Sequence, residues 1–184
     1  YQLYWNIYQS LINHNANDEA KEYIKLALEL PATEDESHKY RALFLYLEED
    51  YKSAIAEFKK LKELDLQSIT SLAYCYKACG EMDRANAVFE NALKENKKNV
   101  SLYNKYGVFL IENEQFNQAI KWLMKGKSVS SDSDTKDVEY NLIIAYEGLQ
   151  DYNTALQMLE LYEASYGTTD VLEKEREFLS TRLS

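Results

Sequence analysis

Residues that interrupt regular structure are scarce in this chain. Its 184 residues include five glycines and one proline, so few tight turns are available and helices are favoured. No run of alternating Val, Ile and Thr bounded by turn residues is present, so strands are not expected. The 46% of apolar residues suffices for a packed core. We therefore predict an all-α fold.

Side chains that bind metals or act as nucleophiles are also scarce. His14 and His38 stand alone in the sequence, and each is expected to be a polar residue facing solvent. Cys75 and Cys79 are four residues apart, a poor geometry for a disulfide on a helix, and without nearby histidines they cannot complete a zinc site. They are interpreted as small apolar side chains. We predict no catalytic residue, no metal and no cofactor, and hence no enzyme.

Positive charge is in deficit, because 31 Asp and Glu oppose 21 Lys and Arg for a formal net charge of -10. A nucleic-acid partner would require a basic face, so none is expected. No run of 18 apolar residues exists, so direct membrane insertion is not expected.

The ends of the sequence leave its cellular location open. It begins at Tyr1 without an initiator Met, which suggests a piece of a longer chain whose preceding segment is unknown. The absence of a targeting segment favours a cytoplasmic location. Two thiols without a disulfide are compatible with a reducing compartment.

An internal repeat is the main positive feature of the sequence. Five similar short segments share one alanine each, at Ala20, Ala54, Ala85, Ala119 and Ala155. Successive alanines are separated by 34, 31, 34 and 36 residues. Apolar residues follow each alanine at helical spacing, and a second amphipathic segment precedes it. The sequence therefore predicts repeated helical hairpins that bury their apolar edges against their neighbours.

The pattern resembles the tetratricopeptide repeat, in which a small residue and Tyr on the first helix precede Ala-x-x-x-Phe on the second. The third repeat matches it with Leu72, Ala73, Tyr76, Ala85 and Phe89. The resemblance covers about residues 1–165 and implies a right-handed superhelical α-solenoid of antiparallel helix pairs. Tyr8 occupies the small-residue position of the first repeat, which implies looser or shifted packing there.

Six segments of one solenoid domain are predicted. The repeats span 1–34, 35–65, 66–99, 100–133 and 134–167, and a capping helix spans 168–184. Asp170 and Glu173 resemble a capping box at the start of that last helix. The alternative is the first helix of a shortened sixth repeat. Residues 128–137 are expected to form a polar, mobile loop.

In tetratricopeptide arrays the first helices line a concave surface, and the resemblance assigns partner-binding residues to this chain. They are Trp5, Lys39, Leu43, Tyr46, Tyr74, Lys77, Asn104, Val108, Ile111, Tyr140 and Ile144. An apolar, aromatic stripe on an acidic protein indicates a binding site. The alternative is that these side chains contact neighbouring repeats.

We therefore expect a protein-interaction scaffold or adaptor that binds a peptide or helix of a protein partner. Chaperone-adaptor members of the family hold a C-terminal carboxylate with Lys and Asn side chains. Trp5, Gln9, Thr70 and Tyr74 occupy the corresponding positions here, so chaperone tails are not expected. Two alternatives are a non-catalytic repeat domain of a larger enzyme and a self-assembling structural subunit.

Overall fold

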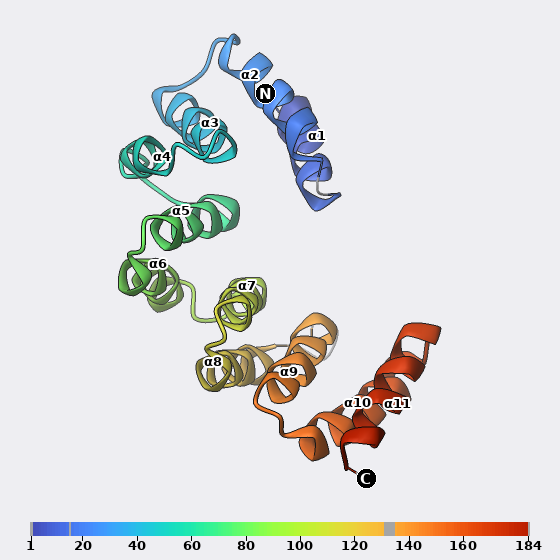
Figure 1. Ribbon diagram of the computed structural model, residues 1–184. Helices are drawn as coiled ribbons and strands as arrows, with labels where there is room; N and C mark the ends of the chain where they lie inside the picture. Colours follow the sequence, from blue (N-terminus) through green and yellow to red (C-terminus); the bar gives the residue numbers. More distant parts are fainter. Residues whose placement is uncertain (1, 15, 131–134, 184) are drawn as a thin grey trace. The chain divides into compact units, whose positions relative to one another are not determined.

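The computed structural model describes residues 2–14, 16–130 and 135–183, and this part of the chain contains helices and connecting loops but no strand. The helices are α1 (Gln2–Asn13), α2 (Asn17–Leu28), α3 (Glu34–Leu47), α4 (Tyr51–Phe58), α5 (Leu66–Ala78), α6 (Met82–Glu95), α7 (Val100–Glu112), α8 (Phe116–Val129), α9 (Lys136–Gly148), α10 (Tyr152–Tyr166) and α11 (Asp170–Leu183) (Figure 1). The prediction of an all-α fold is confirmed.

The chain divides into two compact units, Tyr1–Ala92 and Leu93–Ser184. In the first unit each of the helices α1 to α4 packs on the next one along the chain, and α3 also lies against α5. In the second unit each of α7 to α10 packs on its successor, and α7 lies against α9. The first helices of neighbouring hairpins thus lie side by side in both units, α3 with α5 and α7 with α9.

The repeated alanines are buried at the helix crossings. Ala20, Ala54 and Ala85 in the first unit have no exposed surface, and neither have Ala119 and Ala155 in the second. A methyl group at these positions lets two helix backbones approach closely, while larger neighbours fill the space between them. The repeat pattern therefore identified core positions correctly.

The first repeat accommodates Tyr8 by burying it completely. Its ring stacks on that of Trp5, with centroids 5.3 Å apart, and its exposed fraction is 0%. Burial raises the pKa of the Tyr8 phenol well above its usual range. Of the two expected alternatives, looser packing is wrong because Tyr8 is completely buried, and shifted packing stays a prediction.

Two glycines allow a close crossing of α7 and α8 in the second unit. A methyl group on Gly107 would collide with the side chain of Leu123, and one on Gly126 would lie 2.7 Å from Cβ of Tyr103. Both glycines face large side chains of the partner helix. Because glycine has no Cβ, those side chains fit against the helix backbone at these two positions.

The turns inside the hairpins share one backbone conformation. The residues five positions before four of the repeated alanines have positive φ: Glu49 (61°), Gly80 (77°), Glu114 (57°) and Gln150 (61°). Gly80 follows the last turn of α5 and adopts the left-handed conformation that glycine favours after a helix.

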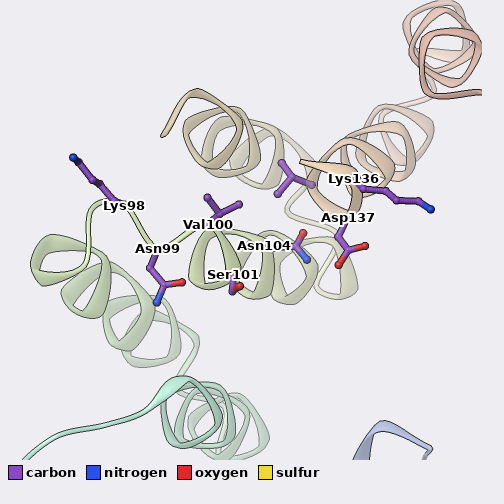
Figure 2. A pocket seen from close by; sticks show the side chains of 8 residues that line it. Lys98, Asn99, Val100, Ser101, Asn104, Lys136 and Asp137 are labelled. Atoms are coloured by element: carbon purple, nitrogen blue, oxygen red, sulfur yellow. The ribbon is translucent and has the colours of Figure 1, made fainter. Parts of the chain in front are cut away.

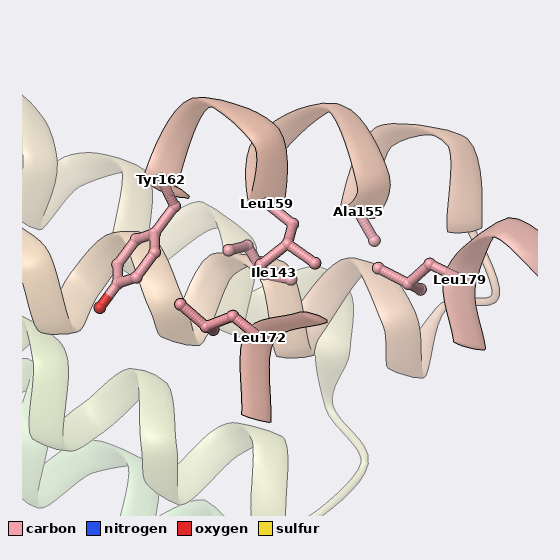
Figure 3. Close-up of a cluster of buried hydrophobic side chains, with 6 residues drawn as sticks. All are labelled: Ile143, Ala155, Leu159, Tyr162, Leu172 and Leu179. Carbon is pink, nitrogen blue, oxygen red and sulfur yellow. The ribbon is translucent and has the colours of Figure 1, made fainter. Parts of the chain in front are cut away.

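The last helix, α11, packs on α10 and closes the apolar core of this region. Leu172 and Leu179 of α11 join Ile143, Leu159 and Tyr162 in one buried cluster (Figure 3). This arrangement agrees with a capping role for the segment.

The start of α11 differs from the prediction. Oγ1 of Thr169 accepts a hydrogen bond from the Leu172 amide at 3.4 Å, so Thr169 caps the helix rather than Asp170. The predicted polar loop at 128–137 is shorter than expected, because α8 continues to Val129 and α9 begins at Lys136. Residues 131–134 lie outside the described part, and the six segment limits stay a prediction.

Candidate functional site

Five predicted partner-binding residues lie on the first helices of the first unit. Trp5 is on α1, Lys39 and Tyr46 are on α3, and Tyr74 and Lys77 are on α5. All five are half-buried, so each retains surface that a partner can contact. We call this set the aromatic surface of the first unit.

Trp5 and Lys39 are brought together although 34 positions separate them in sequence. Nζ of Lys39 lies 3.6 Å from the centroid of the Trp5 ring, a cation–π geometry. The same ammonium donates to Oδ2 of Asp65 at 2.6 Å. Three helices thus converge through one lysine, because Asp65 immediately precedes α5.

Asp65 has two roles at this junction. Besides pairing with Lys39, it accepts a hydrogen bond from the Ser68 amide at 2.8 Å and caps α5. Burial raises the pKa of Asp65, but the hydrogen bonds from Lys39 and Ser68 outweigh burial and hold that pKa below its usual value. The charge of Lys39 is therefore matched inside the protein.

The remaining tyrosines of this surface also have ring neighbours. Nζ of Lys77 lies 5.6 Å from the ring centroid of Tyr74. The ring of Tyr46 lies 6.3 Å from that of Tyr51 at the start of α4. These contacts fix large, flat groups on α3 and α5 at the surface of the unit.

Leu43 has to be removed from the predicted set. Its side chain has no exposed surface, so it cannot contact a partner while the unit is folded. The helical spacing placed Leu43 one turn from Lys39, on a side of α3 that the neighbouring helices cover.

The second unit carries the other five predicted residues. Asn104, Val108 and Ile111 are on α7, and Tyr140 and Ile144 are on α9, all of them half-buried. Oδ1 of Asn104 accepts a hydrogen bond from the side-chain nitrogen Nδ2 of Asn141 at 2.8 Å, and this bond connects α7 to α9. Asn104 therefore serves the fold as well as the surface.

A cavity of about 440 Å³ lies beside Asn104. It is lined by the starts of α7 and α9, including Lys98, Asn99, Ser101, Asn104, Lys136 and Asp137. Figure 2 shows Asn104 and Asp137 close to each other, while Lys98 and Lys136 extend away from the cavity in opposite directions. The cavity is polar, but its two lysines do not converge on a common anion position.

Sequence reasoning missed several polar partners and misplaced one histidine. Asp65 was detectable as a capping residue before an apolar helix, whereas no local signal paired Asn141 with Asn104. His38 was expected to face solvent, but its side chain is 17% exposed and Nδ1 donates to Oε2 of Glu57 at 2.6 Å. His38 is therefore part of the contact between α3 and α4.

The described residues offer little reactive chemistry. Within the described ranges, no three His, Cys, Asp or Glu side chains converge as a metal site would require. Cys75 is buried, and burial raises the pKa of its thiol to about 12, so it stays protonated and unreactive. Among the described helices, none has the length and apolar character needed to cross a bilayer.

Paired helices, buried alanines at a period near 34 residues and an aromatic surface on the first helices define an α-solenoid of helical hairpins. Residues 66–99 match the family model of the tetratricopeptide repeat. The chain therefore contains a tetratricopeptide repeat.

Solved structures of other proteins share this fold. The chain is similar to the C-terminal part of a tetratricopeptide-repeat protein from Cytophaga hutchinsonii, with 15% identity and a TM-score of 0.68 over 97% of this chain and 70% of that one. It is also similar to YrrB, described as a tetratricopeptide-repeat protein with an unusual peptide-binding site, with 17% identity and a TM-score of 0.58 over 95% and 90% of the two chains. At these identities the likeness shows the fold alone.

A curated relative corrects the expected location. The chain is 23% identical over 143 residues to an uncharacterized lipoprotein of Treponema pallidum (strain Nichols), covering 76% of this chain and 73% of the relative. A lipoprotein is attached to a membrane by its lipid, so this relative contradicts the expectation of a cytoplasmic protein. The sequence argument failed because it relied on the absence of a targeting segment from the residues at hand.

Proposed function

We propose that this protein is a non-enzymatic scaffold whose aromatic surface binds a peptide or helix of a partner protein. The tetratricopeptide-repeat fold is a scaffold for protein–protein interaction, and the finer assignment to this surface is our inference. The observation that carries it is the half-buried group of Trp5, Lys39, Tyr46 and Tyr74. In this group Lys39, which lies beside Trp5, is already paired with Asp65.

That pairing predicts what kind of partner surface fits. A partner carboxylate would have to displace Asp65 from Lys39, so an acidic anchor gains little there. Tyr and Trp rings instead provide area at a low cost in side-chain entropy, and such residues dominate many interfaces. An apolar or aromatic stripe of a peptide or amphipathic helix is therefore the favoured ligand. Asn104, Val108, Ile111, Tyr140 and Ile144 form the corresponding proposed surface of the second unit.

Tyr74→Ala tests the assignment. The protein is used as bait in extract of its native cell, the captured partner is purified, and its affinity is measured by biolayer interferometry. Loss of this ring is expected to weaken binding by about 1–3 kcal/mol, mostly through a faster off-rate. Tyr23→Ala on α2, a second helix of a hairpin, is the matched control and should bind as the wild type does.

The melting temperature separates a binding effect from a folding effect. Tyr74→Ala should melt within a few degrees of the wild type because the ring is half-exposed. An unchanged affinity for Tyr74→Ala together with weakened binding by Tyr23→Ala would reverse the assignment of faces. If neither Tyr74→Ala nor Tyr23→Ala weakens binding, the aromatic surface is removed from the proposal.

We also propose that the chain belongs to a membrane-anchored lipoprotein, as its relative in Treponema pallidum is named. Detergent phase separation of the full-length native protein with Triton X-114 tests this directly. Recovery in the detergent phase is expected, with a shift to the aqueous phase after lipase treatment. Recovery of the untreated protein in the aqueous phase contradicts it.

A further inference from the structure

A second cavity of the second unit lies among α9, α10 and α11 and has a volume of about 260 Å³. Its lining includes Lys136, Tyr140, Tyr162, Tyr166, Val171 and Leu172. Drug-sized ligands occupy roughly 300–1,000 Å³, so this cavity is suited to one side chain rather than to a whole ligand or a helix.

Three tyrosines form its aromatic wall. The rings of Tyr140 and Tyr162 are 5.8 Å apart, and those of Tyr162 and Tyr166 are 4.7 Å apart. The Tyr166 hydroxyl is 3.1 Å from Oγ1 of the buried Thr135, which holds that ring in place. Tyr162 is 8% exposed and anchored in the core shown in Figure 3. The wall is therefore rigid before any ligand arrives.

Apolar side chains of α11 form the opposite wall. Leu172 is 7% exposed and belongs to the core, whereas Val171 is 66% exposed. An exposed valine beside a ring-lined cavity leaves apolar surface in contact with water. Covering it with another apolar side chain is favourable, at about 25 cal/mol for each Å² removed from water.

Lys136 places a positive charge beside the rings. Its Nζ lies 5.6 Å from the Tyr166 ring, and the side chain turns away from the polar cavity that it also borders (Figure 2). Among the described residues it forms no ion pair, whereas the neighbouring Glu139 is paired with Lys127 at 2.8 Å. The ammonium is thus available to an incoming anion.

We propose that this cavity receives one large apolar or aromatic side chain of a partner segment, with a carboxylate next to that side chain pairing with Lys136. The proposal deepens the function proposed above, because it specifies part of the partner's chemistry. It differs from the aromatic surface in the surroundings of the cations: there Lys39 is paired with Asp65 and Lys77 lies over the Tyr74 ring, whereas Lys136 borders a cavity of the size of one side chain.

The probe is 3-phenylpropanoate, which joins a phenyl ring to a carboxylate, titrated into the full chain with amide chemical shifts as the readout. For a probe of this size, a dissociation constant in the millimolar range is expected. Saturable shifts should centre on Tyr140, Tyr162, Tyr166 and Gly167. The uncharged 3-phenylpropan-1-ol should bind about two- to five-fold more weakly, the range expected for an exposed charge pair.

Val171→Asp and Val171→Asn form a matched pair of variants at an exposed position that leaves the core intact. The aspartate should repel the probe's carboxylate and raise its dissociation constant several-fold more than the asparagine does. Lys136→Ala should abolish the difference between the acid and the alcohol, and Lys121→Ala on the exposed surface of α8 should preserve it.

Several outcomes overturn the proposal. They are shifts that do not saturate, saturable shifts centred away from the three tyrosines, and equal binding of acid and alcohol by the wild type. The test is independent of partner capture by the aromatic surface. Failure of the probe with Tyr74-dependent capture intact removes only this cavity, whereas probe binding without any Tyr74-dependent partner removes only the assignment of the aromatic surface.

Discussion

At the scale of single residues, Glu57 has three nitrogen-bearing side chains around its carboxylate in the first unit. Its side chain is 11% exposed, and it accepts hydrogen bonds from His38 at 2.6 Å and from Lys60 at 2.7 Å. A guanidinium nitrogen of Arg41 lies 3.7 Å away. Burial raises the pKa of Glu57, but the hydrogen bonds and cations outweigh it and hold that pKa below its usual value. A carboxylate that sequence reasoning did not single out therefore joins α3 to α4.

Glu57→Gln should lower the free energy of unfolding by about 1–3 kcal/mol at pH 7, because a part-buried, charge-assisted hydrogen-bond network is lost. A carboxyl with a lowered folded pKa stabilises the protein above its unfolded pKa, and that contribution is lost as pH falls through the folded value. The difference between variant and wild type should thus shrink as pH falls below 4.5. Urea unfolding at several pH values measures it, with the exposed Glu63→Gln as control. A difference that is constant with pH would contradict the assignment.

At the scale of elements, the left-handed turns are the recurrent joint of the hairpins. The amide of Glu114 donates to the carbonyl of Ile111 and that of Gln115 to the carbonyl of Leu110, each at 2.9 Å. The turn at Gly80 repeats this pattern with Lys77 and Tyr76 as acceptors. These bonds satisfy carbonyls at the helix ends, and they require positive φ even where the residue is not glycine.

Glu114→Gly should raise the free energy of unfolding by about 0.5–1 kcal/mol. A non-glycine residue pays roughly 1–2 kcal/mol in this conformation, and the greater chain entropy of glycine offsets part of the relief. Gly80→Ala makes the opposite change at the equivalent position and should destabilise by a similar amount. Thermal unfolding of both variants provides the measurement. Changes of the same sign in the two proteins would show that the turn conformation does not control stability.

The crossing of α7 and α8 gives a second expectation at this scale. Gly126→Ala should destabilise by about 1–3 kcal/mol, although alanine is the better helix former. The new methyl would meet Cβ of Tyr103, which is fixed to the α7 backbone, so the helices have to separate. Chemical denaturation is the readout, and Ala164→Gly, at an exposed position of α10, measures the intrinsic propensity term. A stabilised Gly126→Ala variant would mean that the two helices are not in close contact.

At the scale of the whole molecule, a net charge of -10 makes carboxyl groups the main determinants of stability against pH. One of them is unusual. Burial raises the pKa of Glu147 on α9 to about 7, and a hydrogen bond and charge repulsion from Glu175 on α11 add to the effect. The two carboxyl groups thus share a contact between α9 and α11 that is favourable only while a proton is held.

The sign of this effect is opposite to that of Glu57. Between pH 4.5 and about 7 the folded protein binds a proton at Glu147 that the unfolded chain releases, so this contribution to stability falls as pH rises. Glu147→Gln keeps a neutral side chain, so its free energy of unfolding should exceed that of the wild type by an amount that grows as pH rises through this window. Partial solvation of the site reduces the full gain to about 1 kcal/mol. Unfolding of both proteins at pH 5 and pH 8 tests this, with Glu160→Gln as control. A gain at pH 5 that vanishes at pH 8 would refute it.

The periodic part of this protein could be predicted from its sequence. The helices, their pairing and the buried alanines follow from local patterns, because apolar spacing near 3.6 residues and a 34-residue repeat act within a few turns of chain. Leu43 shows where this reasoning ended: the pattern identified its helix but not which side the neighbouring helices cover.

Only the tertiary structure decided the polar and aromatic contacts between helices. The contacts of Lys39 with Asp65 and Trp5, of His38 with Glu57 and of Glu147 with Glu175 join residues 19 to 34 positions apart. No periodicity specifies such contacts, because they depend on the rotation and displacement of each helix against the next. Those two quantities place Asp65 against Lys39 but leave Lys136 without an ion pair among the described residues, and thereby determine which of these two lysines can attract an anion.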